Sequence, residues 1–163
     1  MRKLMVKNIL DSDFSVYGRC VNLLSPCSPC IGEKPIRFYR DMMPLGGNET
    51  LSLSVTAVEP MKMVVDVLEF HSSTGECFLS LDGDTCICVG PATADPYPQA
   101  ETLEAFFVPS GTAVYIHPGV WHYAPYPAGD HPIHSLVMLP QRTYANDCYK
   151  CELKADEVME LEI

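Results

Sequence analysis

Two carboxylates and an imidazole lie close together in the sequence and could bind a metal ion. Glu69 and His71 are separated by one residue, and Glu76 follows five positions after His71. Side chains two positions apart on a β-strand share a face, so Glu69 and His71 are expected to point the same way and Phe70 the opposite way. Carboxylate and imidazole groups are ordinary ligands of divalent metals, so this stretch is a candidate half of a metal site.

A second stretch, about fifty residues later, supplies two more imidazoles. His122 follows the turn signal Pro118-Gly119, and His117 precedes it. We predict one divalent metal ion, either Ni, Zn, Mn or Fe, bound by Glu69, His71, Glu76 and His122. His117 is a candidate acid–base residue or proton shuttle beside the ion, with a structural hydrogen bond as the alternative; Glu76 is a candidate acid–base residue if it does not ligate.

The elements that would position these residues are short strands bounded by Gly, Pro, Asp and Asn. The expected strands are Arg37 to Tyr39, Thr50 to Val58, Met63 to Phe70, Cys77 to Leu81, Thr85 to Val89, Ala105 to Val108, Thr112 to His117, and Ile133 to Leu139. Asp82-Gly83-Asp84 is typical of a hairpin turn, which would place Glu76 and the strand after it within one hairpin. Short helical turns are expected only within Lys7 to Tyr17 and Asp156 to Glu160. Many short strands at close spacing predict one all-β barrel domain over residues 1–163.

The composition limits the partners. Acidic residues outnumber basic ones 21 to 11, giving a net charge of -10, and 47% of the 163 residues are hydrophobic. That charge repels phosphate backbones and anionic lipids, so nucleic acid and membrane surfaces are not expected as partners, whereas a small-molecule substrate is. The segment from Leu4 to Leu10 is interrupted by Lys7 and Asn8, and no apolar run reaches the ~20 residues that span a bilayer, so we expect a cytoplasmic protein.

Eight cysteines are present, and in a cytoplasmic protein they are expected as free thiols. Two pairs, Cys27 with Cys30 and Cys148 with Cys151, have the CxxC spacing of zinc sites. A four-thiolate zinc site is therefore an alternative, although 117 residues separate the pairs. Cys86 and Cys88 alternate along an expected strand and are interpreted as packing residues.

The two stretches resemble the paired motifs of the cupin superfamily. The first motif is matched in spacing by Glu69, His71, Glu76 and Gly83, with Glu69 standing where the superfamily usually has His. The second is matched by Gly111, Gly119 and His122, with His117 at the usual proline position and Tyr126 at the usual Asn. The resemblance implies a cupin-type double-stranded β-helix, also called a jelly-roll barrel, with short helical turns.

The chain also resembles the ureidoglycolate lyase family over nearly its whole length. The matching pieces are Asp13-Phe14, Tyr17-Gly18, Phe38 to Asp41, Leu51 to Ser54, Glu69 with His71 and Phe78, Leu103 with Ala105-Phe106, Val114 to His122, and Asn146 to Cys148. This resemblance implies a homodimeric, metal-dependent lyase that releases urea and glyoxylate from ureidoglycolate, a carboxylate, in allantoin and purine breakdown. Phe70 stands where the family usually has Arg, and Glu76 where it usually has Gln. A sugar or hydroxy-acid isomerase or epimerase, and a non-catalytic ligand-binding cupin, remain alternatives.

Overall fold

The computed structural model describes residues 1–46 and 49–163 and is almost entirely β-structure. Its strands are β1 (Arg2–Asn8), β2 (Gly18–Asn22), β3 (Cys30–Ile31), β4 (Phe38–Tyr39), β5 (Leu51–Val58), β6 (Val64–Val65), β7 (Val67–Phe70), β8 (Glu76–Ser80), β9 (Thr85–Val89), β10 (Glu104–Val108), β11 (Thr112–Ile116), β12 (Tyr126–Pro127), β13 (Ile133–Pro140), β14 (Tyr149–Glu152) and β15 (Met159–Glu162). Three short helical turns are η1 (Ile9–Asp11), η2 (Ala100–Thr102) and α1 (Thr143–Asn146). No helix among the described residues is both long and apolar enough to cross a membrane.

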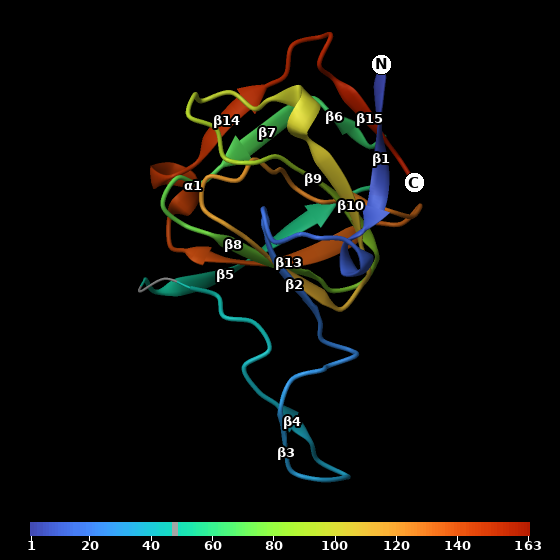
Figure 1. The fold of residues 1–163 in the computed structure, drawn as a ribbon, viewed down its shortest axis with the longest axis vertical. Helices are drawn as coiled ribbons and strands as arrows, with labels where there is room; N and C mark the ends of the chain where they lie inside the picture. Colours follow the sequence, from blue (N-terminus) through green and yellow to red (C-terminus); the bar gives the residue numbers. More distant parts are fainter. Residues whose placement is uncertain (47–48) are drawn as a thin grey trace.

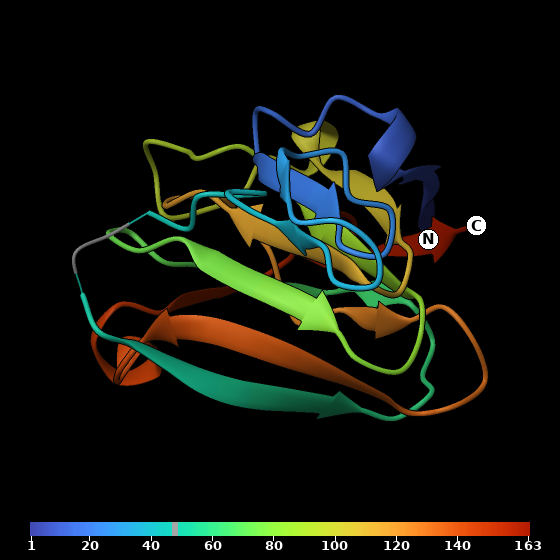
Figure 2. The same cartoon turned by 90° about the horizontal axis from the view of Figure 1, so that it is seen from below.

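The strands form two facing layers, a five-stranded antiparallel sheet and a six-stranded sheet in which β1 is parallel to its neighbours β10 and β15 (Figures 1 and 2). One layer has the order β5-β13-β8-β11, with β2 added beside β11. In the other, β9 pairs with β10 on one side and with β12 on the other. Two bridges extend this layer: Trp121 pairs with Gly90, which follows β9, and His122 pairs with Glu69 of β7. This strand order is that of a jelly roll, the fold of cupins, and it confirms the fold class expected from the sequence.

The expected hairpin at Asp82-Gly83-Asp84 is wrong. β8 lies in the five-stranded sheet and β9 in the six-stranded sheet, so this turn crosses between layers rather than joining paired strands. The carboxylates on either side of the glycine are held by different parts of the chain: Asp82 accepts the backbone N–H of His134, and Asp84 accepts that of Ser110. The Asp-Gly pair therefore predicted a turn correctly, but the strands on its two sides, β8 and β9, do not pair with each other.

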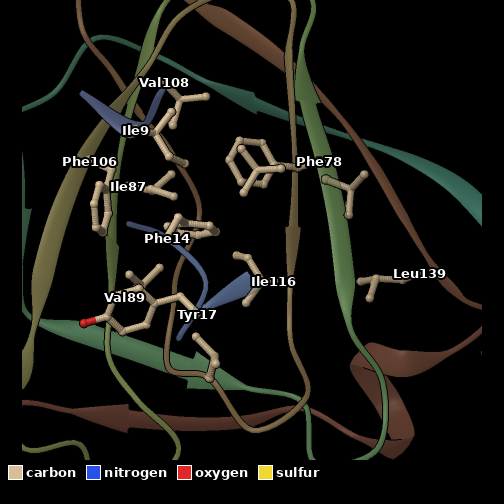
Figure 3. Close-up of a cluster of buried hydrophobic side chains, with 13 residues drawn as sticks. Ile9, Phe14, Tyr17, Phe78, Ile87, Val89, Phe106, Val108, Ile116 and Leu139 are labelled. Atoms are coloured by element: carbon tan, nitrogen blue, oxygen red, sulfur yellow. The ribbon is translucent and has the colours of Figure 1, made fainter. Parts of the chain in front are cut away.

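The space between the two layers is filled by an apolar cluster to which both sheets contribute (Figure 3). Phe14, Tyr17 and Phe106 are in aromatic contact with one another, with ring centroids 5.3 to 6.0 Å apart. The other buried members are Ile9, Phe78, Ile87, Val89, Val108, Val114, Ile116, Val120, Val137 and Leu139.

A second apolar cluster covers the opposite face of the six-stranded sheet. All five residues of β9 are therefore buried: Ile87 and Val89 face the first cluster, whereas Cys86 and Cys88 face the second. The predicted packing role of Cys86 and Cys88 is confirmed. The second cluster also contains Trp121, which is 1% exposed.

Both ends of the described chain belong to this sheet. β1 pairs in parallel with β10 and with β15, and ion pairs of 2.6 Å link Lys3 to Glu162 and Lys7 to Glu104 across these strands. The helical turn expected over Asp156 to Glu160 is wrong beyond its first residues, because Met159 begins β15 and its side chain is fully buried in the second cluster. β1 was not predicted from the sequence, because most of its side chains are exposed and the strands it pairs with are distant in the chain.

The expected strand Met63 to Phe70 is divided at Asp66, whose carbonyl accepts the N–H of Leu153. Its first part, β6, pairs with β15, and its second part, β7, pairs with β14. Glu69 is the third residue of β7, and His71 directly follows this strand.

Residues 23–44, which we call the arm, extend away from the two layers and end in the small β3–β4 sheet (Figure 1). The arm carries Cys27 and Cys30, both exposed. It also exposes the large apolar side chains of Leu24, Ile31, Ile36 and Phe38.

Candidate metal centre

Glu69 and His122 are placed opposite each other by the backbone. The N–H of Glu69 donates to the carbonyl of His122 at 2.6 Å, and the N–H of His122 donates to the carbonyl of Glu69 at 2.8 Å. Directly opposite residues of an antiparallel bridge place their side chains on the same face. Since His71 lies two residues after Glu69, it reaches that face as well.

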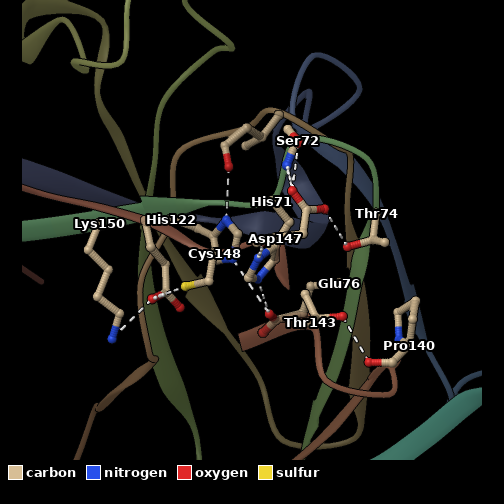
Figure 4. Close-up of polar contacts among 12 residues, drawn as sticks. His71, Ser72, Thr74, Glu76, His122, Pro140, Thr143, Asp147, Cys148 and Lys150 are labelled. Carbon is tan, nitrogen blue, oxygen red and sulfur yellow. Dashed lines mark hydrogen bonds and ion pairs between the residues drawn. The ribbon is translucent and has the colours of Figure 1, made fainter. Parts of the chain in front are cut away.

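The ring of each histidine is held by a backbone carbonyl. His71 Nδ1 lies 2.7 Å from the carbonyl oxygen of Asp147, and His122 Nδ1 lies 2.9 Å from that of Val120 (Figure 4). A carbonyl only accepts hydrogen bonds, so both Nδ1 atoms carry hydrogen and, in the neutral rings, both Nε2 atoms present lone pairs. This is the arrangement of metal-binding histidines, whose second nitrogen donates to a carbonyl or carboxylate.

One ligand atom from each of Glu69, His71 and His122 lies within 4.8 Å of the others, and all three side chains are buried. His122 Nε2 is buried without a hydrogen-bond partner among the described residues. The Glu76 carboxylate oxygen Oε2 lies 3.2 Å from His71 Nε2 and 3.6 Å from His122 Nε2. Lone pairs and negative charge converge at this point, and a divalent metal ion would satisfy them together, so the residues fit such an ion.

The pKa shifts of Glu76 and His71 agree with a site that binds a cation. Burial alone would raise the pKa of Glu76, but contacts with His122 and His71 outweigh it and lower that pKa to about 2. Burial opposes charging of His71, yet its contacts with Glu76 and the Asp147 carbonyl raise its pKa above the usual value. Glu76 is therefore a carboxylate at neutral pH, and the surrounding site favours positive charge.

Asp147 fixes the loop that follows His71. Its carboxylate accepts hydrogen bonds from the N–H and hydroxyl groups of both Ser72 and Ser73, at 2.6 to 3.0 Å, while its carbonyl holds the His71 ring. Burial opposes its ionisation, but the serine hydrogen bonds prevail and lower the pKa of Asp147 to about 2. Sequence reasoning noticed Asp147 only as part of a family match and gave it no role.

Replacing Asp147 with alanine is expected to reduce the free energy of unfolding by about 2–4 kcal/mol, since the loop loses several hydrogen bonds to a charged acceptor. Chemical denaturation followed by circular dichroism measures the change. Asp156→Ala is the matched control, because Asp156 is exposed and should change stability by less than about 0.5 kcal/mol. Equal stability of Asp147→Ala and wild-type protein would contradict the assigned role of this carboxylate.

Two further groups contact Glu69 at the end of β7. The ammonium of Lys150 lies 3.3 Å from Glu69 Oε2, and the thiol of Cys148 lies at the same distance from that oxygen. Burial, and then the charge of Glu69, raise the pKa of the Cys148 thiol to about 11, so this cysteine is protonated at neutral pH. No local pattern marked Lys150 in the sequence; it reaches the site only because β14 pairs with β7.

The predicted acid–base residue His117 is placed elsewhere. Its ring lies edge-on to that of Tyr115, 5.7 Å between centroids, and Tyr115 lines a different cleft. The turn after it forms as expected: Gly119 has φ of +79°, which favours glycine, and its N–H donates to the carbonyl of His71. His117 thus precedes a turn that supports the centre, but its side chain lines no part of the cleft at the centre that the described residues define.

His131 and His134 are exposed, as expected. All eight cysteines lie within the described residues and none is in a disulfide. The two CxxC pairs do not form a ligand group; within residues 1–46 and 49–163, the group suited to a metal is the one containing Glu69.

Phe70 points away from this Glu/His/His group and packs on Trp121 and Tyr149.

The jelly-roll fold and the buried Glu/His/His group identify this chain as a protein of the cupin class. The family model described as ureidoglycolate lyase matches residues 1–160, so the chain belongs to the ureidoglycolate lyase family. A ureidoglycolate lyase of Rhodobacter capsulatus is 26% identical over 133 residues, covering 79% of this chain and 81% of that protein.

Among solved structures, the similar chains include oxalate decarboxylase of Bacillus subtilis. One such structure, concerned with its Mn(II) centres, shows 22% identity and a TM-score of 0.46. Another, of the same enzyme at pH 4.6, shows 22% identity and a TM-score of 0.45. Each match covers 64% of this chain and 24% of that chain, so this protein spans about a quarter of their length.

Proposed function

We propose that this protein is a metal-dependent ureidoglycolate lyase that converts ureidoglycolate into urea and glyoxylate. The observation that carries the proposal is that the pieces shared with the family, Glu69 with His71 and the segment ending at His122, meet in one buried Glu/His/His group. The group opens on a cleft of about 300 Å³ that Glu69 and Glu76 line, large enough for a substrate of this size.

Glu69, His71 and His122 would hold the ion, and Glu76 is near enough to both imidazoles to join them. When bound, a divalent ion would supply Lewis acidity toward the oxygens of the substrate. Mn, Fe, Ni and Zn all suit this mixture of nitrogen and oxygen ligands. Elemental analysis of purified protein identifies which of them is bound.

The reaction requires a proton to move from the substrate hydroxyl to the departing nitrogen. As the O–H and C–N bonds break, a C=O bond and an N–H bond form, so glyoxylate and urea are released without water or a redox partner. The Glu76 carboxylate lines the cleft and is our candidate to accept the hydroxyl proton, which a bound divalent ion would make more acidic, and to return it to the urea nitrogen.

The direct test is to supply ureidoglycolate and measure glyoxylate as its phenylhydrazone, together with urea. We expect release of the two products in equal amounts, abolished by a chelator and restored by the native metal. A wild-type protein with full metal content and no product release would contradict the lyase proposal. Turnover of sugars or other hydroxy acids by such a protein would instead support the isomerase or epimerase alternative.

We further propose that the protein acts in the cytoplasm, in the breakdown of allantoin and purine nitrogen, and that it is a homodimer. Support for self-association comes from the arm, where Leu24 is 77% exposed and Ile36 79% exposed, since solvated apolar groups of this size favour burial. The arm has three basic and two acidic residues, so its net charge is positive, whereas that of the whole chain is -10. The basic residues are Lys34, Arg37 and Arg40, and the acidic ones are Glu33 and Asp41.

Light scattering at micromolar concentration is expected to give twice the 18.1 kDa mass of one chain. Replacing Ile36 and Phe38 together by serine should shift the population toward monomer, because both exposed side chains lie on the arm. Val16→Ser is the control, since Val16 is comparably exposed but lies outside the arm. A wild-type monomer at this concentration would contradict the dimer.

A further inference from the structure

The cleft at the metal centre is lined by two carboxylates and a single cation. Lys150 is the one Lys or Arg among the described residues that line it, and the two carboxylates are those of Glu69 and Glu76. A chain of net charge -10 with carboxylates at its cleft repels small anions. An anionic ligand therefore needs a local positive group, and the lining provides one.

Backbone pairing places that cation beside the candidate metal ligands. Lys150 is directly opposite Glu69 in the antiparallel β7–β14 pair, and its Nζ lies 3.3 Å from Glu69 Oε2 (Figure 4). The ammonium also lies 5.4 Å from the centre of the Tyr123 ring, and Tyr123 lines the same cleft. Both contacts hold the head group at the cleft, while its side chain is 56% exposed and reachable from solvent.

We propose that Lys150 binds the carboxylate of a small substrate in this cleft and so determines its specificity for anionic ligands. An ammonium has three donors; one reaches Glu69, which leaves donors for a ligand carboxylate. Charge-assisted hydrogen bonds of this kind are the strong ones and discriminate an acid from its uncharged analogue. The proposal rests on the proposed lyase function, and it identifies the residue by which that cleft recognises a carboxylate.

The chain offers a closely matched control. Lys154 also pairs with a glutamate, Glu157, at 3.6 Å, and also lies over a tyrosine ring, that of Tyr97, at 4.8 Å. It does not line the cleft. Lys150→Met and Lys154→Met therefore remove the same kind of group with the same kind of neighbours, once inside the candidate site and once outside it.

The experiment measures binding of two probes by calorimetry to purified wild-type protein, Lys150→Met, Lys150→Arg and Lys154→Met. The probes are glyoxylate and glycolaldehyde, its uncharged counterpart of the same chain length. Lys150→Met is expected to weaken glyoxylate binding about tenfold or more, the usual effect of losing a hydrogen bond to a charged group. Lys150→Arg should restore most of that loss, and Lys154→Met should leave binding unchanged.

Three results would overturn the proposal: wild-type protein that binds no glyoxylate, unchanged glyoxylate binding in Lys150→Met, or an equal loss of both probes. Circular dichroism and metal content are measured for every variant, and a loss of metal in Lys150→Met would show that Lys150 acts by positioning Glu69 instead.

The lyase proposal fails separately. Lys150-dependent glyoxylate binding in a protein that does not cleave ureidoglycolate would leave the carboxylate site standing and remove the lyase. Cleavage of ureidoglycolate with an unchanged KM in Lys150→Met would do the reverse.

Discussion

Replacing His122 by alanine is expected to lower divalent-metal affinity at least about 100-fold while leaving the jelly roll folded. Replacing a residue that only orients a metal ligand already lowers metal affinity about 10–100-fold. His122 would itself be a ligand through Nε2, so its replacement is expected to cause a larger loss. That nitrogen has no hydrogen-bond partner among the described residues, so little native structure depends on it in the absence of an ion. His71→Ala should behave in the same way. Each substitution also removes one hydrogen bond from Nδ1 to a backbone carbonyl, that of Asp147 for His71 and that of Val120 for His122.

Elemental analysis of dialysed protein, alongside circular dichroism, measures both effects. His134→Ala is the matched control, because His134 is exposed and pairs with Asp82 on the surface, so it should retain metal at the wild-type level. Glu69→Gln should weaken binding less than either histidine substitution, since an amide oxygen can ligate but carries no charge. Wild-type metal content in both His122→Ala and His71→Ala would contradict the ligand assignment.

Replacing Glu76 by glutamine is expected to lower kcat about 100-fold or more, which is the usual contribution of a positioned acid–base group. An amide has the same shape as the carboxylate but cannot accept the proton of the substrate hydroxyl. If Glu76 acts only as a base, the variant should keep its metal; if it is a fourth ligand, metal content should fall as well. Glu162→Gln, which removes a surface ion pair with Lys3, is the control.

Steady-state kinetics on ureidoglycolate, with metal content measured on the same samples, separate these outcomes. Full activity in Glu76→Gln would contradict the assignment of Glu76 as the base, and it would direct attention to the other ionisable groups that line the cleft, which are Glu69, Tyr123, Tyr144 and Lys150.

Part of the candidate metal centre could be predicted from sequence because it is local, although His122 meets Glu69 only through a bridge between distant segments. Glu69 and His71 are two residues apart on one strand, and His122 follows a turn that its glycine enforces. The packing of Cys86 and Cys88 was predictable for the same reason, since alternation along β9 decides which face each side chain occupies. Period-two patterns carry this information within a single strand.

What could not be predicted depends on which strands pair. Lys150 belongs to the site only because β14 lies beside β7, and Asp147 only because the chain after α1 returns to the loop that follows His71. The Asp-Gly turn after β8 had the composition of a hairpin, but burial of β9 on both faces requires it to leave the sheet that contains β8. Pairing between distant segments follows from burial of the whole chain, which no short window of sequence records.

The parallel pairing of β1 with β15 has a consequence for how this sheet folds. Arg2 to Met5 lie beside Met159 to Glu162, which are far from them in the sequence, so this part of the sheet closes only when the two distant segments meet. Met159 and Leu161 belong to the second apolar cluster, so its burial is completed by the same contact. Leu68, which immediately precedes Glu69, is buried in that same cluster. The burial of Leu68, and with it the placement of Glu69, therefore depends on a contact between distant segments, and non-local pairing of this kind is slow to form.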